Sequence, residues 1–427
     1  MTATATAPST DPDLVTRTPG EIRRARILGF VFFGLAAVVF IVFVLGTESG
    51  AEATWRLSRP TDSVTVPDLV IPVNAFAMVI AVVLAFLGAI QITRGFGKKA
   101  NIFLGVGMLL FILAFLAWAS AGNSFSMAGM LDATVFRAVP IALGALSGVL
   151  CERAGVINIA IEGQLLMGAF VGVVVGSLWG LWPGLIAAVL SGAILSWVLA
   201  VLSIRYLVDQ IIAGFFIWIV SLGLTSFLTA QLLIPFPELN NSGTFQPIAI
   251  PLLSDIPVIG PILFDQNIFV YAMFILVGAI QYGLMRTRWG LRARSVGEKP
   301  EAADTVGINV WRTRYRNVIL GGLVAGLGGA WFTLGSVGRF DENMTGGRGF
   351  IALAAMIVGR HSPVGALGAA LVFGFADSLQ QKLAILQTPI PSEFLLMAPY
   401  LATIIVVAGL VGRARVPAAD GQPYVKE

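Results

Sequence analysis

Apolar blocks of roughly 18 to 25 residues, the length that a helix needs to cross the hydrocarbon core of a membrane, alternate along the chain with short polar segments. Each block predicts a membrane-spanning helix. Two blocks fit a half-helix or re-entrant piece as well as a span, because 131–150 contains Arg137 and Pro140 and 350–359 is too short to cross. We therefore expect about ten to twelve spans and an all-α polytopic fold. The predicted spans are 27–46, 69–92, 100–121, 131–150, 163–180, 184–203, 209–234, 268–286, 316–335, 350–359, 364–381 and 394–412.

Positive charge is distributed unevenly between the two sides of this predicted topology. If the chain starts inside, most of its 27 Lys and Arg residues fall on the inner side. This imbalance follows the positive-inside rule and places both termini in the cytoplasm. The formal net charge of +4 is then explained by topology, and nucleic-acid binding is not expected. The residues on the outer side are Arg56, Arg59, Arg137, Arg339, Arg348 and Lys382.

Composition excludes several kinds of chemistry. Charged residues make up 12% of the chain and hydrophobic residues 57%, whereas a soluble domain carries about 25% charged residues. The single cysteine, Cys151, and the single histidine, His361, leave no internal disulfide and no Cys- or His-based metal cluster. No sequence of the P-loop type is present. We therefore expect neither a metal site nor ATP hydrolysis, and we name no catalytic residue.

The inner loop Arg286–Arg316 holds eight Lys and Arg residues and three acidic residues between two apolar spans. Its middle predicts a short helix, because Pro300 suits the first turn, Glu301 favours the positive end of the helix dipole and Gly307 ends it. Two alanines would give this helix a flat surface that fits a groove on a soluble partner. A plain basic loop is the alternative. The candidate docking residues are Glu298, Pro300, Glu301, Ala302, Ala303, Gly307 and Ile308.

A second candidate region, residues 151–168, reads CERAGVINIAIEGQLLMG and places ionisable groups in an apolar setting. Such groups are costly at membrane depth and are usually buried or face a watery cavity. Glu162 precedes Gly163, which suggests a break where a helix restarts, and broken helices in transporters often line the substrate path. A structural hinge or ordinary turn remains open. The candidates for path or hinge are Glu152, Arg153, Gly155, Asn158, Glu162 and Gly163.

Glycines at four-residue spacing predict close contact between helices, because small residues let backbones approach in lipid. They are Gly168, Gly172 and Gly176 in one span and Gly322 and Gly326 in a later one. On the outer side, loop 235–267 contains no Lys or Arg and would either dock a binding protein or cap the bundle. Loop 335–350 would form a gate, a docking site or a solvated loop.

Three motifs carry a resemblance to a known family: CERAGVINIAIEGQLLMGAF, GEKPEAADTVGI and GRGFIALAAMIVGRHSPVGALGAAL. Over roughly residues 130 to 412 the chain resembles the permease subunits of bacterial ABC importers, the group that includes ribose, branched-chain amino acid and nucleoside permeases. It is most similar to the nucleoside-type permeases that work with a basic-membrane-protein lipoprotein.

The resemblance implies a vitamin B12-importer-like (type II) fold with inverted repeats, in a bacterial plasma membrane. Together with the small, polar composition of the first residues, which predicts disorder, it gives four expected segments: a disordered cytoplasmic N-terminus (1–26), a transmembrane extension (27–130), the permease core (131–412) and a cytoplasmic tail (413–427). The implied partners are an ABC ATPase subunit, a second related permease and a lipid-anchored binding protein on the outer side. ATP and Mg would be bound by the ATPase, so we expect no cofactor on this chain, and the docking helix would couple the two subunits.

The most favoured cargo is a nucleoside, followed by a simple sugar and then a branched-chain amino acid. An ion-coupled secondary transporter is a different class of function, for which Glu162 and Asp377 are the candidate acidic groups. A membrane-embedded enzyme is a third class, which the scarcity of His and Cys disfavours.

Overall fold

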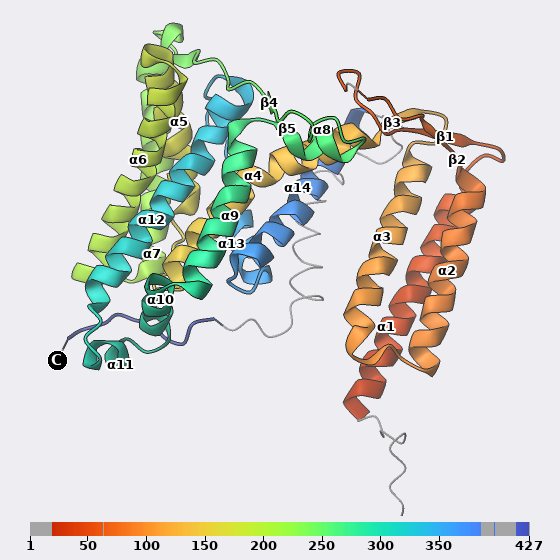
Figure 1. The fold of residues 1–427 in the computed structure, drawn as a ribbon, viewed down its shortest axis with the longest axis horizontal. Helices are drawn as coiled ribbons and strands as arrows, with labels where there is room; N and C mark the ends of the chain where they lie inside the picture. The colour runs from red at the N-terminus through yellow and green to blue at the C-terminus, as the bar shows by residue number, and fades with distance from the viewer. Residues whose placement is uncertain (1–18, 63, 386–396, 398–415, 427) are drawn as a thin grey trace, which may run out of the picture. The chain divides into compact units, whose positions relative to one another are not determined.

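The computed structural model describes residues 19–62, 64–385, 397 and 416–426 (Figure 1). Within these ranges, ten helices are long and apolar enough to cross a membrane, and each strand contains only two to five residues. The predicted all-α polytopic fold is thereby confirmed. Each predicted span overlaps one of these helices except 350–359, which forms a shorter helix, and 394–412, which lies outside the described residues apart from residue 397.

The chain divides into two compact units. The first contains Met1–Arg56 and Asp68–Phe125, and the second contains Leu57–Pro67 and Ser126–Glu427. The chain therefore enters the second unit briefly, returns to the first, and then enters the second again.

The first unit contains three long helices whose apolar faces meet around Phe32, Phe43 and Leu84. Helix α1 (Pro19–Val38) begins before the predicted span, so residues 19–26 are helical and the expectation that they are disordered is wrong. Pro19 is tolerated as the first residue of the helix because the first turn needs no backbone N–H donor. Three short strands, β1 (Glu52–Arg56), β2 (Leu69–Pro72) and β3 (Ser124–Ser126), pair in the order β2-β1-β3, with β1 and β2 antiparallel. The other elements are η1 (Val39–Val44), α2 (Val73–Thr93), η2 (Gly97–Lys99) and α3 (Ala100–Ala119).

The second unit is a helical bundle with short elements at its ends. Its first half contains α4 (Met127–Glu152), α5 (Ile161–Trp179), α6 (Leu181–Ala200) with η3 (Val201–Arg205), and α7 (Gln210–Leu228) with η4 (Thr229–Leu233). The connection to the second half contains η5 (Pro237–Asn240), β4 (Ile248–Ala249), α8 (Ile259–Phe264) and β5 (Asp265–Gln266). The second half contains α9 (Ile268–Arg286), α10 (Arg288–Glu298), α11 (Pro300–Thr305), α12 (Val310–Ala330) with η6 (Trp331–Val337), α13 (Arg348–Val358) and α14 (Pro363–Ile385).

Helices α4, α5 and α12 form the centre of this bundle and are mostly buried, whereas α6 and α7 leave most of their surface exposed. Helix α4 packs against α12, α13 and α14, and α12 packs against α5 and α6. The segment 131–150 is thus a full-length helix rather than a half-helix. Its Pro140 and its buried neighbours Leu143 and Leu146 lie inside the core.

Helix α13 contains 11 residues and is therefore only about 16 Å long, roughly half the hydrocarbon thickness. It is preceded by a non-helical stretch from Gly338 to Gly347. The segment 350–359 is accordingly a half-length helix, one of the two forms expected of it.

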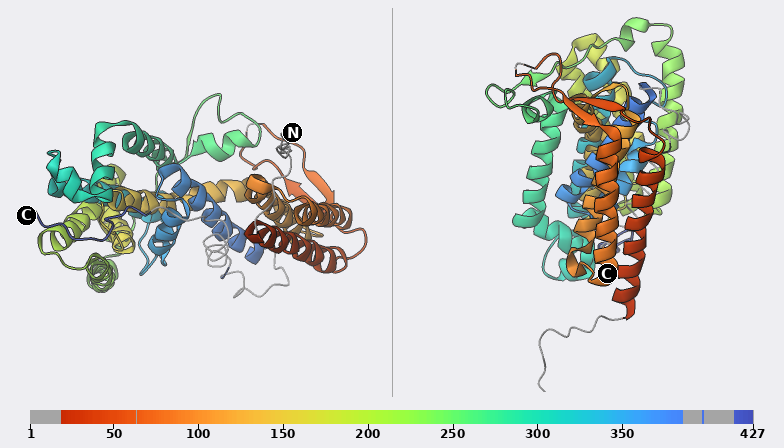
Figure 2. Two further views of the ribbon diagram at one scale, coloured as in Figure 1. Left: turned by 90° about the horizontal axis from the view of Figure 1, so that it is seen from below. Right: turned by 90° about the vertical axis from the view of Figure 1, so that its right-hand side faces the viewer.

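The short elements of the second unit gather at opposite ends of its bundle (Figure 1, Figure 2). Helices α10 and α11 lie at one end, here called the α11 end, together with residues 416–426, here called the tail segment. Helix α8 and the β4–β5 pair lie at the other, here called the α8 end. These two ends carry most of the polar structure described below.

Candidate functional site

The predicted docking helix is one of two consecutive helices at the α11 end. Thr287 caps α10 by accepting a hydrogen bond from the Gly290 amide (3.3 Å), and Lys299 separates α10 from α11. The sequence predicted only the second helix, because the basic residues of α10 resemble an ordinary membrane-flanking loop. Pro300 does occupy the first turn of α11, and Gly307 follows its end with a positive φ of 82°.

The two alanines of α11 face different ways. Ala302 is exposed together with Glu301 and the neighbouring Val306, whereas Ala303 is buried at 3% exposure. The expectation that both alanines form one flat outer surface is therefore wrong, because their positions in the helix turn one of them inward. Of the remaining candidates, Glu298 is exposed, Pro300 is buried and Ile308 is partly buried.

The tail segment lies against both short helices, a contact that the sequence did not predict. The Ala419 amide donates to the Gly297 carbonyl of α10 (2.9 Å), and Lys426 forms an ion pair with Asp304 of α11 (3.3 Å). Tyr424 is buried in a small apolar cluster with Val296, Ala303 and Val310. The tail segment therefore completes the packing around α11.

A buried polar cluster joins the tail segment to the ends of three long helices. Glu152, the last residue of α4, lies 2.8 Å from Nε2 of His361, which precedes α14. Arg153 donates from Nε to the His361 carbonyl (2.8 Å). Arg314 of α12, which is 1% exposed, donates to the Gln422 carbonyl (2.9 Å). Glu152 and Arg153 thus belong to the α11 end.

Asp420 of the tail segment lies against Glu152 in this cluster. Burial raises the pKa of Asp420 to about 8, and the negative charge of Glu152 and a hydrogen bond with it contribute to the shift. Gly155 has a φ of 80°, and a side chain there would approach the Ala419 carbonyl and the Arg314 guanidinium at 3.1 Å. Gly155 therefore permits the close approach of the tail.

Glu162 lies elsewhere, within the bundle, and holds the start of the half-length helix α13. Its carboxylate accepts hydrogen bonds from Thr345 Oγ1 (2.7 Å), the Gly347 amide (2.8 Å) and the Gly349 amide (2.5 Å). The side chain is buried, so these donors and the positive end of the α13 dipole stabilise its charge. Gly163 packs closely against Trp218 and Ser221 of α7.

Asn158 belongs to a separate buried polar network between α4, α5 and α6. Its amide nitrogen lies 3.2 Å from Gln164 Oε1 and 3.3 Å from Ser147 Oγ, and Gln164 donates to Ser196 Oγ (2.9 Å). The structure therefore distributes the six residues of the predicted path or hinge over three places rather than one.

The spaced glycines lie where α5, α6 and α12 approach one another. A Cβ on Gly168 would lie 2.8 Å from the Gly326 carbonyl oxygen, and one on Gly184 of α6 would lie 2.7 Å from the Gly172 carbonyl oxygen. Gly322 is in close contact with Ser196 and Gly192, and Gly176 with Leu334 and Ser242. Backbones cross at these positions with no room for a side chain.

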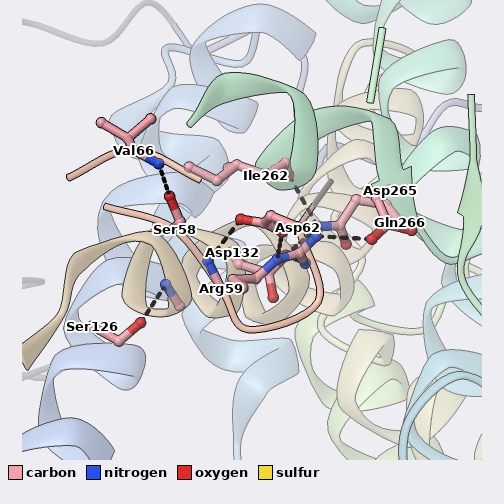
Figure 3. A network of polar contacts seen from close by, with 10 residues as sticks. Ser58, Arg59, Asp62, Val66, Ser126, Asp132, Ile262, Asp265 and Gln266 are labelled. Carbon is pink, nitrogen blue, oxygen red and sulfur yellow. Dashed lines mark hydrogen bonds and ion pairs between the residues drawn. The ribbon is translucent and has the colours of Figure 1, made fainter. Parts of the chain in front are cut away.

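Two ion-pair networks lie toward the α8 end. In one, Asp377 of α14 pairs with Arg137 of α4 and with Arg348 of α13, both at 3.2 Å. In the other, Figure 3 shows Arg59 surrounded by Asp62, Asp132 and Asp265, at 2.9, 3.4 and 2.8 Å. Both networks join residues far apart in the sequence, which is why no local motif revealed them.

Residues 130–412 match the family described as branched-chain amino acid transport system / permease component. The chain is similar to the guanosine ABC transporter permease protein NupQ of Bacillus subtilis (strain 168), with 40% identity over 307 residues that cover 70% of this chain and 96% of that protein. It is also similar to the nucleoside ABC transporter permease protein NupC of Lactococcus lactis subsp. cremoris (strain MG1363), at 39% identity over 301 residues, 67% of this chain and 93% of that protein.

A third relative is the putative glucose ABC transporter permease protein TsgC13 of Haloferax volcanii, at 33% identity over 328 residues, 70% of this chain and 98% of that protein. No solved structure matches the chain. The family match spans more than half of the sequence, and it confirms the resemblance first carried by the three motifs. The protein therefore belongs to the branched-chain amino acid transport system / permease component family and is a multi-pass membrane permease of the ABC type.

Proposed function

We propose that this protein is the membrane-spanning permease of an ATP-driven importer for nucleosides. The observation that carries the proposal is the identity of 40% and 39% to two permeases named for guanosine and nucleosides, over almost their whole lengths. The bundle of long apolar helices supplies the membrane path that such a subunit needs.

The α11 end is the surface at which we expect an ABC ATPase subunit to dock. Glu301, Ala302 and Val306 are exposed there, and Val306 is 74% exposed, so their side chains are free to contact a partner. ATP and Mg would be bound by that separate subunit. The basic residues of this end orient it toward the cytoplasm by the positive-inside rule, in a bacterial plasma membrane with both termini inside.

Transport would proceed by alternating access between this chain and a second, related permease. Movement of α10 and α11 on ATP binding would be passed to the bundle through α12, which follows α11 directly. A lipid-anchored binding protein would deliver the solute at the α8 end.

Other cargoes and another energy source are the competing possibilities. The relative named as a glucose permease supports a simple sugar, and the family description supports a branched-chain amino acid. An ion-coupled transporter needs a carboxylate that binds and releases the ion. Glu162 is instead engaged by three donors, and Asp377 by two arginines, which favours ATP-driven transport.

Reconstitution of this chain into proteoliposomes with its copurifying ATPase, the second permease and the binding protein tests the proposal. We expect uptake of labelled guanosine to require ATP on the side of the membrane where the α11 end and its ATPase lie. Guanosine uptake should also exceed the uptake of glucose or leucine. Glu301→Arg reverses a charge on the exposed face of α11, so this variant should lose the ATPase during purification and lose ATP-driven uptake.

Glu48→Arg is the matched control, because Glu48 is an exposed glutamate in the first unit and undergoes the same charge reversal. This control should retain both the ATPase and the uptake activity. Uptake driven by a proton or sodium gradient without ATP would refute the importer. Preferential uptake of glucose would refute the nucleoside assignment while leaving the importer in place.

A further inference from the structure

The helix α11 is too short to hold its own position. It contains six residues, and isolated helices shorter than about 12 to 15 residues are marginal in water. Its stability must come from contacts with its surroundings. Only Pro300 and Ala303 of α11 are buried, and the apolar cluster around Ala303 consists of Val296 of α10, Val310 of α12 and Tyr424 of the tail segment.

The tail segment makes an anchoring contact with each element around α11. Its Ala418 amide donates to Glu298 (3.3 Å) and its Ala419 amide donates to Gly297, both at the end of α10. Its Gln422 carbonyl accepts from Arg314 of α12. On α11 itself, Asp304 pairs with Lys426 and forms a hydrogen bond with the Tyr424 phenol, whose pKa is raised by desolvation and by this contact.

We propose that the tail segment fixes the position of α10 and α11 during energy coupling, with Tyr424 and Asp420 as its positioning residues. The inference rests on the proposed function, since it gives α11 the task of passing ATPase movement to the bundle. A short helix with loose neighbours would move without displacing α12. The tail segment ties α10, α11 and the end of α12 into one body, so that movement at the ATPase reaches the long helices.

The charge arrangement adds a dependence on pH. Asp420 faces Glu152 of α4 and Arg314 of α12, and Glu152 in turn faces His361 before α14, while Arg153 and Glu298 lie nearby. The docked Asp420 holds its proton up to about pH 8, whereas a free aspartate loses it near pH 4. The docked tail therefore binds the extra proton, and docking weakens by up to about tenfold per pH unit as pH rises from about 4 to 8.

The test uses the whole transporter in proteoliposomes and compares guanosine transported per ATP hydrolysed. Tyr424→Ala should lower this ratio about tenfold while ATP hydrolysis continues, because the apolar cluster loses its ring. Tyr424→Phe keeps the ring and should restore most of the ratio. Val425→Ala is the matched control, since Val425 is the exposed neighbour (66%) and should behave as the wild type.

Amide hydrogen exchange of residues 288–305, measured on the same samples, separates this inference from the proposed function. Tyr424→Ala should accelerate exchange in α10 and α11. In the wild type, amide exchange in α10 and α11 should rise between pH 6 and pH 8 by more than the intrinsic chemical rate of exchange rises. Asp420→Asn should abolish this additional rise, because the asparagine side chain has no proton to lose in this range.

Each outcome decides the inference. Unchanged exchange in Tyr424→Ala means that the tail does not hold the helices, and faster exchange with an unchanged transport ratio means that it has no part in coupling. An additional rise that persists in Asp420→Asn removes Asp420 from the positioning role. If the wild type shows no ATP-driven uptake, the proposed function fails and this coupling role fails with it, while the exchange data still report whether the tail holds α11.

Discussion

At the scale of single residues, Glu162 shows how a costly buried charge is made tolerable. Its three donors come from the five-residue stretch Thr345–Gly349, which lies 183 to 187 residues later in the chain. Gly349 lies so close to Glu162 that an added Cβ would be 2.5 Å from the Glu162 Cα. The glycines of this stretch therefore allow backbone amides to reach the carboxylate directly.

Glu162→Gln tests this arrangement. The substitution removes the charge and turns an NH₂ group toward at least one amide donor, which leaves that donor unpaired. Hydrogen bonds to charged groups contribute about 1.5–3 kcal/mol each, so we expect a loss of about 2–3 kcal/mol in stability. The measurement is the melting temperature of the purified protein in detergent.

Glu238→Gln serves as its control, because Glu238 is exposed in η5 and a surface change of this kind stays within about 0.5 kcal/mol. An equal melting temperature for Glu162→Gln and the wild type would contradict the structural role given to the carboxylate. It would also reopen ion binding at Glu162.

The sequence indicated the importance of Glu162 but could not identify its partners. A buried ionisable residue before a glycine is a local signal, and the motif around Gly347–Gly349 was part of the family resemblance. That these two places meet depends on the packing of α5 against α13. No local pattern encodes that contact.

At the scale of elements, the bundle depends on close crossings of α5, α6 and α12. The predicted spans located these helices well, because length and hydropathy are properties of contiguous residues. Their ends were less predictable. Helix α12 begins at Val310 rather than near residue 316, since Asn309 caps it by accepting from the Arg312 amide (2.8 Å) and its polar first turns project beyond the apolar block.

Gly168→Ala tests the crossing of α5 and α12. The new methyl group would lie 2.8 Å from the Gly326 carbonyl oxygen, which belongs to backbone and cannot rotate away, so the helices must separate. Overpacking of this kind costs about 1–3 kcal/mol. A lower melting temperature in detergent should record it.

Gly278→Ala in α9 makes the same chemical change in open space, because no atom lies within 4 Å of the added Cβ. Alanine is the better helix former by up to about 1 kcal/mol, so this control should match or exceed the wild type. Equal melting temperatures for Gly168→Ala and Gly278→Ala would show that α5 and α12 do not depend on close packing at Gly168.

At the scale of the whole molecule, Arg59 holds a short segment of the chain that belongs to the second unit. Residues Leu57–Pro67 belong to the second unit although the first unit precedes and follows them. Arg59 attaches this segment to Asp132 of α4 and to Asp265 beside β5, and its side chain is only 17% exposed. This connection could not be predicted, because the outer loops showed no periodic pattern.

Arg59→Ala should release the segment, because it leaves Asp62, Asp132 and Asp265 near one another without their cation. A local loss of about 1.4 kcal/mol corresponds to about tenfold faster cleavage by a protease that attacks the open form. The measurement is the rate of thermolysin cleavage before Val64 in the folded protein.

Arg339→Ala removes an arginine whose ion pair with Asp341 is 67% and 60% exposed, and exposed pairs contribute little. Cleavage of the 57–67 segment should be unaffected in this control. The same unaffected rate in Arg59→Ala would show that the segment is held by other contacts.

The tail segment also has a consequence in time. Ala418 contacts Glu298, a residue 120 positions earlier in the chain, and ribosomes add about 5–20 residues per second. Helix α11 is therefore synthesised roughly 6 to 24 seconds before Tyr424. During that interval Ala303 lacks its contact with the Tyr424 ring, so the packing around α11 is completed only after the helices of the bundle have been translated.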